Sequence, residues 1–217
     1  MPTLHGIPVS PFVRKVRIAL QEKSISYEIN PVAPVPPAND DPKFRAMSPL
    51  GKVPAYEDGD FSISDSSVIL AYLDRTNPAP SIYPQDAQAC ARATWLEEFA
   101  DSSLAEAVGP IFFQRIVAKA FFQREPDQAV IDQAMGERIP PAFDYLEGQL
   151  NGGDFLVGDQ LSVADIATGS MLRTFRIAGE SPDSARWPKL AAYAEQLLGR
   201  ASFKECAIAE DAMLKGG

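Results

Sequence analysis

The chain has 217 residues, of which 46% are apolar, and a formal net charge of −9. This length allows one large or two modest domains with real hydrophobic cores. The negative charge repels phosphate backbones, so we expect no nucleic-acid partner, and no basic or long apolar run predicts a membrane surface or span. The first residues lack the charged and apolar regions of a signal peptide, which makes the cytoplasm the expected compartment.

Cysteine and histidine usage excludes several kinds of site. Cys90 and Cys206 are far apart and form no Cys-x-x-Cys pattern, so they predict small buried apolar residues rather than a disulfide framework. His5 is the only histidine, so a multi-histidine metal site or a histidine-based triad cannot be assembled, and we expect no metal. Any thiol chemistry would use a thiol that the protein borrows, or one of these two cysteines.

The first elements along the chain predict a strand, a helix and a second strand. After a strand around Leu4 and a turn, Ser10 suits a helix N-cap and Pro11 suits the first helical position. The helix should run to about Glu22, and a strand at 27–29 would complete a βαβ unit with parallel pairing. Its expected buried face consists of Phe12, Val13, Val16, Ala19 and Leu20. Its expected solvated face carries Arg14, Lys15 and Arg17.

The next stretch contains the strongest local signals, after a proline-rich loop that ends near Pro42. Two short strands, 55–56 and 61–63, flank a typical hairpin turn. Val53-Pro54 stands at the entry to the first of them, where a proline must be an edge residue, a bulge or a cis turn. The short polar residues at 64–67 then open a helical pattern. A helix start with hydroxyls and free N–H groups can hold a carboxylate.

The remainder of the chain is almost entirely helical in pattern. We expect a first domain at 1–78, a linker at 79–84 and an all-α domain of roughly five helices at 85–217. The expected helical segments are 85–123 with a break or bend near Gly109-Pro110, 126–149 interrupted at Pro140-Pro141, 162–177, 188–198 and 202–209. Ser162-Val163-Ala164-Asp165 is a capping pattern, to which we assign a structural role.

Three stretches together resemble the glutathione transferases. Val53-Pro54 matches the family's apolar residue before a cis-proline, and Asp65-Ser66, some eleven residues later, matches an acidic–serine pair in which glutamate is more usual. Ser10, followed by Arg14-Lys15-Val16, matches the serine that serine-type members present at the start of the first helix. The segment 155–165 closely resembles the family's signature in its helical domain. The chain is identified over essentially its whole length as a member of this family.

The resemblance implies an α/β thioredoxin-like N-terminal domain followed by an all-α C-terminal domain, with glutathione as co-substrate. Ser10 would be catalytic, donating its hydroxyl hydrogen to the glutathione sulfur; the alternative is a plain N-cap serine. The implied glutathione-binding residues are Lys52, Val53, Pro54, Asp65 and Ser66. Val53 would hold the peptide through its backbone, Asp65 would face the γ-glutamyl amine, and Lys52 would face the glycyl carboxylate or remain a solvated loop lysine. Asn39, where some relatives place a basic ligand, is left out.

In the family, the electrophile pocket lies between the first helix and the long fourth helix. The candidate pocket residues here are Phe12, Phe112, Phe113, Arg115 and Ile116. An aromatic stripe at helical spacing is as often part of the core, so both interpretations stay open. Glu98 and Asp101 lie on the helix that commonly meets the partner subunit, where they would reach the partner's glutathione or form a solvated acidic face. The resemblance also implies a homodimer.

The sequence therefore predicts a glutathione transferase that activates the glutathione thiolate for attack on a small hydrophobic electrophile. Two alternatives stay open. One is glutathione-dependent disulfide or peroxide reduction, which would use the same activated thiol. The other is a non-catalytic binding protein of the same fold, against which the joint presence of Ser10, Val53-Pro54 and Asp65-Ser66 argues.

Overall fold

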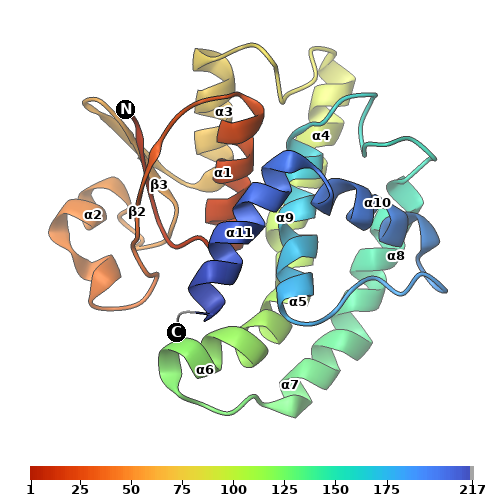
Figure 1. The fold of residues 1–217 in the computed structure, drawn as a ribbon. Helices are drawn as coiled ribbons and strands as arrows, with labels where there is room; N and C mark the ends of the chain where they lie inside the picture. Colours follow the sequence, from red (N-terminus) through yellow and green to blue (C-terminus); the bar gives the residue numbers. More distant parts are fainter. Residues whose placement is uncertain (216–217) are drawn as a thin grey trace. The chain divides into compact units, whose positions relative to one another are not determined.

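The computed structural model describes residues 1–215, which form two compact units (Figure 1). Unit 1 comprises residues 1–82 together with the C-terminal helix α11 (Ala201–Lys215), and unit 2 comprises residues 83–200. The domain boundaries expected from the sequence, 1–78 and 85–217, stay a prediction. The structure adds that the last helix belongs by its contacts to the unit that the N-terminus begins.

Unit 1 contains a four-stranded mixed sheet in the order β2-β1-β3-β4. Strand β1 pairs in parallel with β2 and antiparallel with β3, and β3 and β4 form a hairpin. The elements besides α11 are β1 (Thr3–His5), α1 (Pro11–Glu22), β2 (Glu28–Asn30), a 3-10 turn (Ala38–Asp40), α2 (Pro42–Met47), β3 (Ala55–Asp58), β4 (Phe61–Ser64) and α3 (Ser66–Thr76). Helix α1 packs against α3, and α2 packs against the hairpin (Figure 1). This is the order of elements expected for a thioredoxin-like domain.

The strand register brings three loops to one edge of the sheet. His5, the last residue of β1, pairs with Ala55, the first residue of β3. Ala55 in turn pairs with Ser64, the last residue of β4. The loop that follows β1, the loop that precedes β3 and the start of α3 therefore leave the sheet side by side. These loops carry the residues that the sequence singles out for glutathione.

Helix α1 begins where the sequence predicts, with Ser10 as its N-cap and Pro11 as its first residue. Its cationic residues, however, are buried: the exposed fractions are 0% for Arg14, 1% for Lys15 and 4% for Arg17. The expected solvated face of this helix is therefore wrong. Helical periodicity distinguishes the strongly apolar face of a helix but does not show what other parts of the chain cover the opposite face.

The C-terminal helix α11 covers much of that face. Arg14 Nε donates a hydrogen bond to Glu210 Oε1 at 2.5 Å, and both side chains are fully buried. Arg17 Nη1 donates to the carbonyl of Cys206 at 3.4 Å, and its Nε donates to the Tyr27 hydroxyl at 3.2 Å. Buried charges are tolerated when they are paired and hydrogen-bonded, and α11 supplies that pairing.

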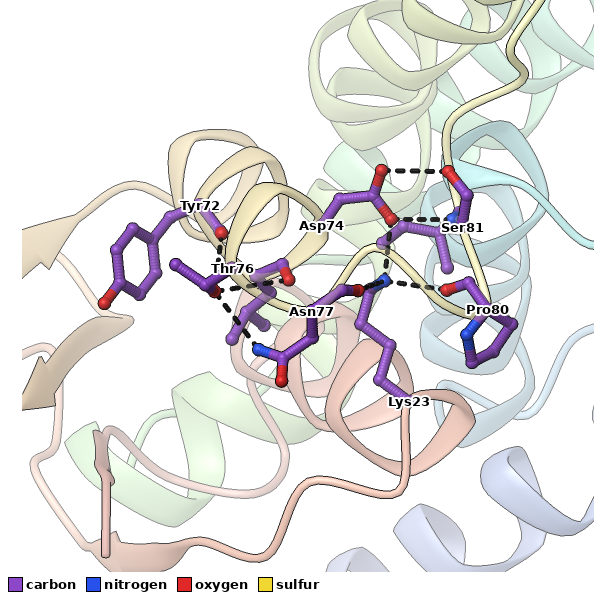
Figure 2. Close-up of polar contacts among 9 residues, drawn as sticks. Lys23, Tyr72, Asp74, Thr76, Asn77, Pro80 and Ser81 are labelled. Atoms are coloured by element: carbon purple, nitrogen blue, oxygen red, sulfur yellow. Dashed lines mark hydrogen bonds and ion pairs between the residues drawn. The ribbon is translucent and has the colours of Figure 1, made fainter.

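A buried lysine joins the ends of α1 and α3 to the segment that leaves unit 1. Figure 2 shows Lys23 donating from Nζ to the carbonyls of Asn77 and Pro80, at 2.7 Å each, and forming an ion pair with Asp74 at 2.7 Å. Asp74 also accepts a hydrogen bond from Ser81 Oγ at 2.9 Å. These charge-assisted bonds hold the chain between residues 77 and 81 against α1 and α3.

Unit 2 is helical in every regular element that the structure describes. Its α-helices are α4 (Ala87–Phe99), α5 (Ala105–Phe112), α6 (Ala118–Phe122), α7 (Gln128–Gln133), α8 (Ile139–Gln149), α9 (Val163–Ile177) and α10 (Pro188–Leu198). Three π-helical turns, Ala100–Leu104, Phe113–Val117 and Ala134–Arg138, connect some of them without a break. No helix within residues 1–215 is both long and apolar enough to cross a membrane.

The long helical run from α4 to α6 is not broken at Gly109-Pro110, where the sequence predicts a break or bend. Pro110 lies inside α5 and has no N–H to give to the carbonyl of Glu106, four residues earlier. Arg138 Nη1 donates to that carbonyl at 3.3 Å instead. Pro140 and its neighbour fall in the first turn of α8, where a missing N–H matters little.

Helix α9 begins after its N-cap Ser162, as the capping pattern predicts. Asp165 is fully buried and accepts hydrogen bonds from the backbone N–H groups of Leu156 and Ser162, both at 2.8 Å, and from the Tyr193 hydroxyl at 2.7 Å. Burial raises the pKa of this carboxyl, although the hydrogen bonds favour its ionised form. The cluster ties the preceding loop, α9 and α10 together, which is the structural role that we expect from the sequence.

Candidate functional site

Ser10 is 8% exposed and stands at the N-terminus of α1. Its Oγ accepts a long hydrogen bond of 3.5 Å from Val13 N, and its own backbone N–H donates to the Ile7 carbonyl at 3.1 Å. Within residues 1–215, no protein atom accepts the hydroxyl hydrogen of Ser10. That hydrogen can therefore be donated to a ligand, at a helix end whose dipole favours negative charge.

The Val53–Pro54 peptide bond is cis, as predicted. Both residues are buried, and the loop that leads to Ser10 approaches Val53 closely. Gly6, in that loop, has a φ of +147°, and a Cβ atom there would lie 2.4 Å from Val13 Cγ2 and 3.2 Å from Val53 Cβ. Glycine at this position thus allows the Ser10 loop to approach the cis-proline loop closely.

Lys52 lies just before this cis peptide, and its side chain is exposed. Its carbonyl accepts a hydrogen bond from Ser48 Oγ at 2.7 Å, which fixes the loop beneath it. Asn39 donates from Nδ2 to the Gly51 carbonyl at 3.2 Å, so the residue left out of the predicted site helps to hold this loop. A cation on a fixed loop, open to solvent, suits an anionic group of a ligand.

Asp65 is the N-cap of α3, and its Oδ1 accepts hydrogen bonds from Ser67 N at 2.9 Å and Val68 N at 3.2 Å. Its φ of +82° is uncommon for a residue other than glycine, and strain of this kind concentrates at functional sites. Ser66 is 4% exposed, and no other residue within 1–215 hydrogen-bonds to its hydroxyl. The helix start therefore presents an exposed, fixed carboxylate beside a hydroxyl that can bind a ligand.

Lys15 joins this helix start to α1. Its Nζ donates a hydrogen bond to Ser67 Oγ at 2.8 Å, and the residue is 1% exposed. Sequence reasoning missed this contact because helical periodicity assigned Lys15 to solvent. Only the packing of α1 on α3 reveals it, and the sequence carries no local signal for that contact.

The residues predicted to line an electrophile pocket come from both units. Those in unit 2 are Phe112, Phe113, Arg115 and Ile116. Phe113 is 39% exposed, whereas Phe12 of unit 1 is half-buried. Arg115 Nη1 donates to the Ala178 carbonyl at 2.7 Å and forms an ion pair with Glu180 at 2.7 Å. The charge of Arg115 is thus matched within its own unit, and the pocket itself stays a prediction.

Neither cysteine lies in the loops that carry Ser10, Val53 and Asp65. Burial raises the pKa of the Cys206 thiol to about 11, although the neighbouring Arg17 favours the thiolate. Cys90 is half-buried on α4. Among residues 1–215, no group of three or more histidine, cysteine, aspartate or glutamate side chains is arranged to hold a metal ion.

Comparison with known proteins agrees with this geometry. Residues 4–81 match the family model "Glutathione S-transferase, N-terminal domain", and residues 112–205 match "Glutathione S-transferase, C-terminal domain". Glutathione S-transferase 3 of Zea mays is 30% identical over 210 residues, which cover 95% of this chain and 93% of that protein. The chain belongs to the glutathione S-transferase family.

Solved structures of glutathione S-transferases share the whole fold. Glutathione transferase F7 from Populus trichocarpa superposes with a TM-score of 0.84 at 26% identity, covering 96% of this chain and 99% of that one. A glutathione S-transferase from Methylobacterium radiotolerans, solved in complex with glutathione sulfonate, gives a TM-score of 0.77 at 28% identity, covering 94% and 93%. The expected fold, a thioredoxin-like domain followed by a helical one, and the family assignment made from sequence motifs are both confirmed.

Proposed function

We propose that this protein binds glutathione in unit 1 and uses Ser10 to stabilise the glutathione thiolate for attack on a small hydrophobic electrophile. The observation that carries the proposal is the Ser10 hydroxyl, which is buried at the N-terminus of α1 with its hydrogen accepted by no described residue. Membership of the glutathione S-transferase family supports glutathione as the source of the thiol. In the reaction, the sulfur forms a bond to the electrophilic carbon, and a leaving group departs with its bonding electrons.

The three loops at the sheet edge suit the three parts of glutathione. Asp65 would pair with the γ-glutamyl amine, and Ser66 at the helix start would take the γ-glutamyl carboxylate. The backbone of Val53, before the cis-proline, would hold the extended peptide. Lys52 would face the glycyl carboxylate. A tripeptide spans roughly 10 Å when extended, which is the scale of neighbouring loops on one sheet edge.

The energy required of Ser10 is within the range of a single hydrogen bond. A thiol with a pKa near 8.5 is only about 3% ionised at pH 7, and lowering the pKa by about two units makes most of it nucleophilic. Two units correspond to about 2.7 kcal/mol. A hydrogen bond to a charged group contributes roughly 1.5–3 kcal/mol, and a helix N-terminus adds roughly 0.3–1 kcal/mol. Ser10 and α1 together therefore account for the required shift.

Ser10→Ala tests this proposal. The variant removes the donor but leaves the peptide contacts at Val53 and Ser66, so glutathione should keep most of its affinity. The pKa of bound glutathione should rise toward its free value, and turnover at neutral pH should fall about ten- to a hundredfold. Ultraviolet absorbance of the bound thiolate, titrated against pH in both proteins, measures the shift. Raising the pH should recover part of the lost rate.

Two further variants separate chemistry from capping. Ser162→Ala removes an N-cap hydroxyl from α9, outside the proposed site, and should leave the thiolate titration unchanged. Ser10→Thr keeps a hydroxyl and should retain part of the shift. Coincident titration curves for wild type and Ser10→Ala would mean that Ser10 only caps α1.

A panel of electrophiles and disulfides, assayed with glutathione, would distinguish conjugation from disulfide reduction.

The family resemblance also leads us to infer a homodimer in the cytoplasm. Glu98 and Asp101 lie on or directly after α4, the helix that the resemblance places at the partner subunit. Light scattering of the purified protein tests the dimer, and a monomer at micromolar concentration would contradict it.

A further inference from the structure

The loop at 48–52, which leads into the cis peptide, is held through its carbonyl groups. Ser48 Oγ donates a hydrogen bond to the Lys52 carbonyl at 2.7 Å, and Asn39 Nδ2 donates to the Gly51 carbonyl at 3.2 Å. The Gly51 N–H donates to the Ser48 carbonyl at 2.8 Å, which closes a turn. The carbonyls on both sides of the Lys52 N–H and of the Lys52 side chain are therefore fixed by residues that precede the loop.

Arg45 of α2 braces the same loop. Its Nη1 donates to the Pro49 carbonyl at 3.1 Å, and its Nη2 donates to Asp40 Oδ1 at 2.6 Å. Gly51 has a φ of +64°, and a Cβ atom there would lie 2.6 Å from Arg45 Cζ. The guanidinium thus lies against Gly51, which only glycine allows. Asp40 follows Asn39 in the 3-10 turn, so Arg45 ties that turn to the loop.

These contacts set the direction of two backbone N–H groups. The peptide bonds on either side of Lys52 are not cis, and in a trans peptide the N–H points away from the C=O. The Lys52 N–H therefore points away from Asn39, and the Val53 N–H points away from Ser48. Neither N–H donates to another residue within 1–215, so both are available to a ligand.

Stability alone does not account for the side chains that hold the loop. Oδ1 of Asn39 is buried and no described residue donates a hydrogen bond to it, which costs free energy. The side chains of Arg45 and Asp40 are 36% and 52% exposed, and an exposed ion pair contributes little to stability. Asn39 and Arg45 both contact Gly51, directly before the residue proposed to face the glycyl carboxylate, Lys52.

We propose that Asn39 and Arg45 are positioning residues for the glycyl end of glutathione. They hold the Gly51–Lys52 peptide so that the N–H and the ammonium of Lys52 face the glycyl carboxylate, without touching the ligand themselves. A lysine side chain loses conformational entropy when it binds, and a backbone that is already fixed reduces that cost. The inference rests on the proposed function, because it adds two residues to the same glutathione site.

The test compares two ligands in wild type, Asn39→Ala and Arg45→Met. The ligands are glutathione and γ-glutamylcysteinamide, which ends in a neutral amide and has no glycyl residue. Calorimetry should show that each variant binds glutathione about five- to tenfold more weakly, and the amide less than about twofold more weakly. The amide should keep its contacts because Ser48 still directs the Val53 N–H. In steady-state kinetics, KM for glutathione should rise by more than kcat falls.

Lys43→Met is the matched control for the change in net charge. Lys43 lies on α2 with Arg45, but its side chain is exposed and makes no hydrogen bond or ion pair within residues 1–215. Its replacement should change the affinity for either ligand by less than about twofold. Asn39→Ala, which removes a single hydrogen bond, carries the test if Arg45→Met does not fold.

A double variant shows whether Arg45 acts through Lys52. Lys52→Met alone should weaken glutathione binding, and adding Arg45→Met should weaken it less than about twofold further, because the ammonium that Arg45 positions is already absent. The ultraviolet titration of the bound thiolate should be the same in wild type and Arg45→Met, since Ser10 is unchanged. That readout separates this role from the one proposed for Ser10.

Unchanged glutathione affinity in the Asn39 and Arg45 variants, or in Lys52→Met, would overturn the inference and leave the proposed function intact. Equal losses for the two ligands would also overturn it, because the side chains would then act on the fold alone. Losses that multiply in the double variant would mean that Arg45 acts independently of Lys52, which contradicts the inference. Wild-type protein that binds no glutathione would overturn the proposed function itself.

Discussion

The two carboxylate oxygens of Asp65 can have different roles, one in capping α3 and the other in binding the proposed ligand. Oδ1 accepts the N–H groups of Ser67 and Val68, which caps α3. Asp65 is exposed, so its Oδ2 remains available to an amine. Replacing Asp65 with alanine would therefore combine the loss of a cap with the loss of a charge. A variant that keeps the cap is needed to isolate the binding role.

Asp65→Asn provides that separation. Asparagine keeps an oxygen for the cap and is among the residues that best tolerate positive φ, while the negative charge is lost. We expect glutathione affinity to fall about tenfold in calorimetry, with the melting temperature within about 2 °C of wild type. Asp65→Ala serves as the contrast, since it should lose the same affinity and a further 0.5–2 kcal/mol or so of stability. If Asp65→Asn binds glutathione as tightly as wild type does, Asp65 does not bind the γ-glutamyl amine.

The N-caps and the cis-proline that the sequence predicts correctly have local signals. Ser10 and Asp65 are N-caps, and Val53-Pro54 is a dipeptide, so a few neighbouring letters suffice to single them out. Lys15 and Asn39 carry no such signal, because their roles arise from contacts with Ser67 and Gly51 on other elements. The resemblance to a family supplied the link between the local motifs, and the strand register explains physically why they converge.

At the scale of elements, the cap of α9 offers a test of stability that is independent of the proposed chemistry. Ser162 Oγ donates to Asp165 Oδ2 at 2.9 Å, and the Ser162 N–H donates to the same oxygen at 2.8 Å. Ser162→Ala removes the side-chain bond and should lower the free energy of unfolding by about 1 kcal/mol, within a range of about 0.5–2. The pKa of Asp165, already raised by burial, should rise further because one hydrogen bond to its ionised form is lost.

Urea unfolding of Ser162→Ala beside Ser162→Thr, which keeps the hydroxyl, measures this effect. Glutathione affinity should be the same in all three proteins. If activity falls while stability does not, Ser162 acts on a ligand rather than on α9, and the structural role assigned from the capping pattern is wrong.

The sequence predicts the presence of most helices and strands better than it predicts where each one begins and ends. Helix α10 has the bounds that its pattern predicts, whereas α11 extends to Lys215 rather than ending near 209. Helix α2 was not predicted, because it follows a proline-rich segment and spans only Pro42–Met47. Of the break or bend expected near Gly109-Pro110, the break is absent, and Arg138, which is distant in sequence, donates to the carbonyl that Pro110 leaves without a donor. Each difference comes from a tertiary contact that local propensity does not contain.

At the scale of the whole molecule, the C-terminal helix α11 stabilises the N-terminal helix α1. Helix α11 packs on α1 within unit 1, and the fully buried pair Arg14 and Glu210 joins them. Arg14 Nη2 also donates to the Val9 carbonyl at 3.4 Å, which belongs to the residue before Ser10. The loop that carries the proposed catalytic serine is therefore connected through one guanidinium to a helix that follows all of unit 2 in the sequence.

This ion pair predicts that removing one charge destabilises the protein much more than removing both charges. Glu210→Gln keeps the shape of the side chain but removes the negative charge of Glu210 from the buried ion pair with Arg14, which should cost about 3–5 kcal/mol of stability. That is a large share of the roughly 5–15 kcal/mol that stabilises a typical protein. The double variant Arg14→Met/Glu210→Leu removes both charges and fills the same space, so it should recover most of the loss or exceed wild type by about 1–4 kcal/mol.

Denaturant unfolding followed by two probes measures this response. Both tryptophans, Trp95 and Trp187, lie in unit 2, so their fluorescence follows that unit, whereas circular dichroism reports the helices of both. Glu210→Gln should shift the circular dichroism transition to lower denaturant, and the double variant should shift it back. A loss below about 1 kcal/mol for Glu210→Gln, or a double variant less stable than either single variant, would contradict a pairing role. In that case the contacts of α11 with α1 other than the ion pair would hold the chain end on unit 1.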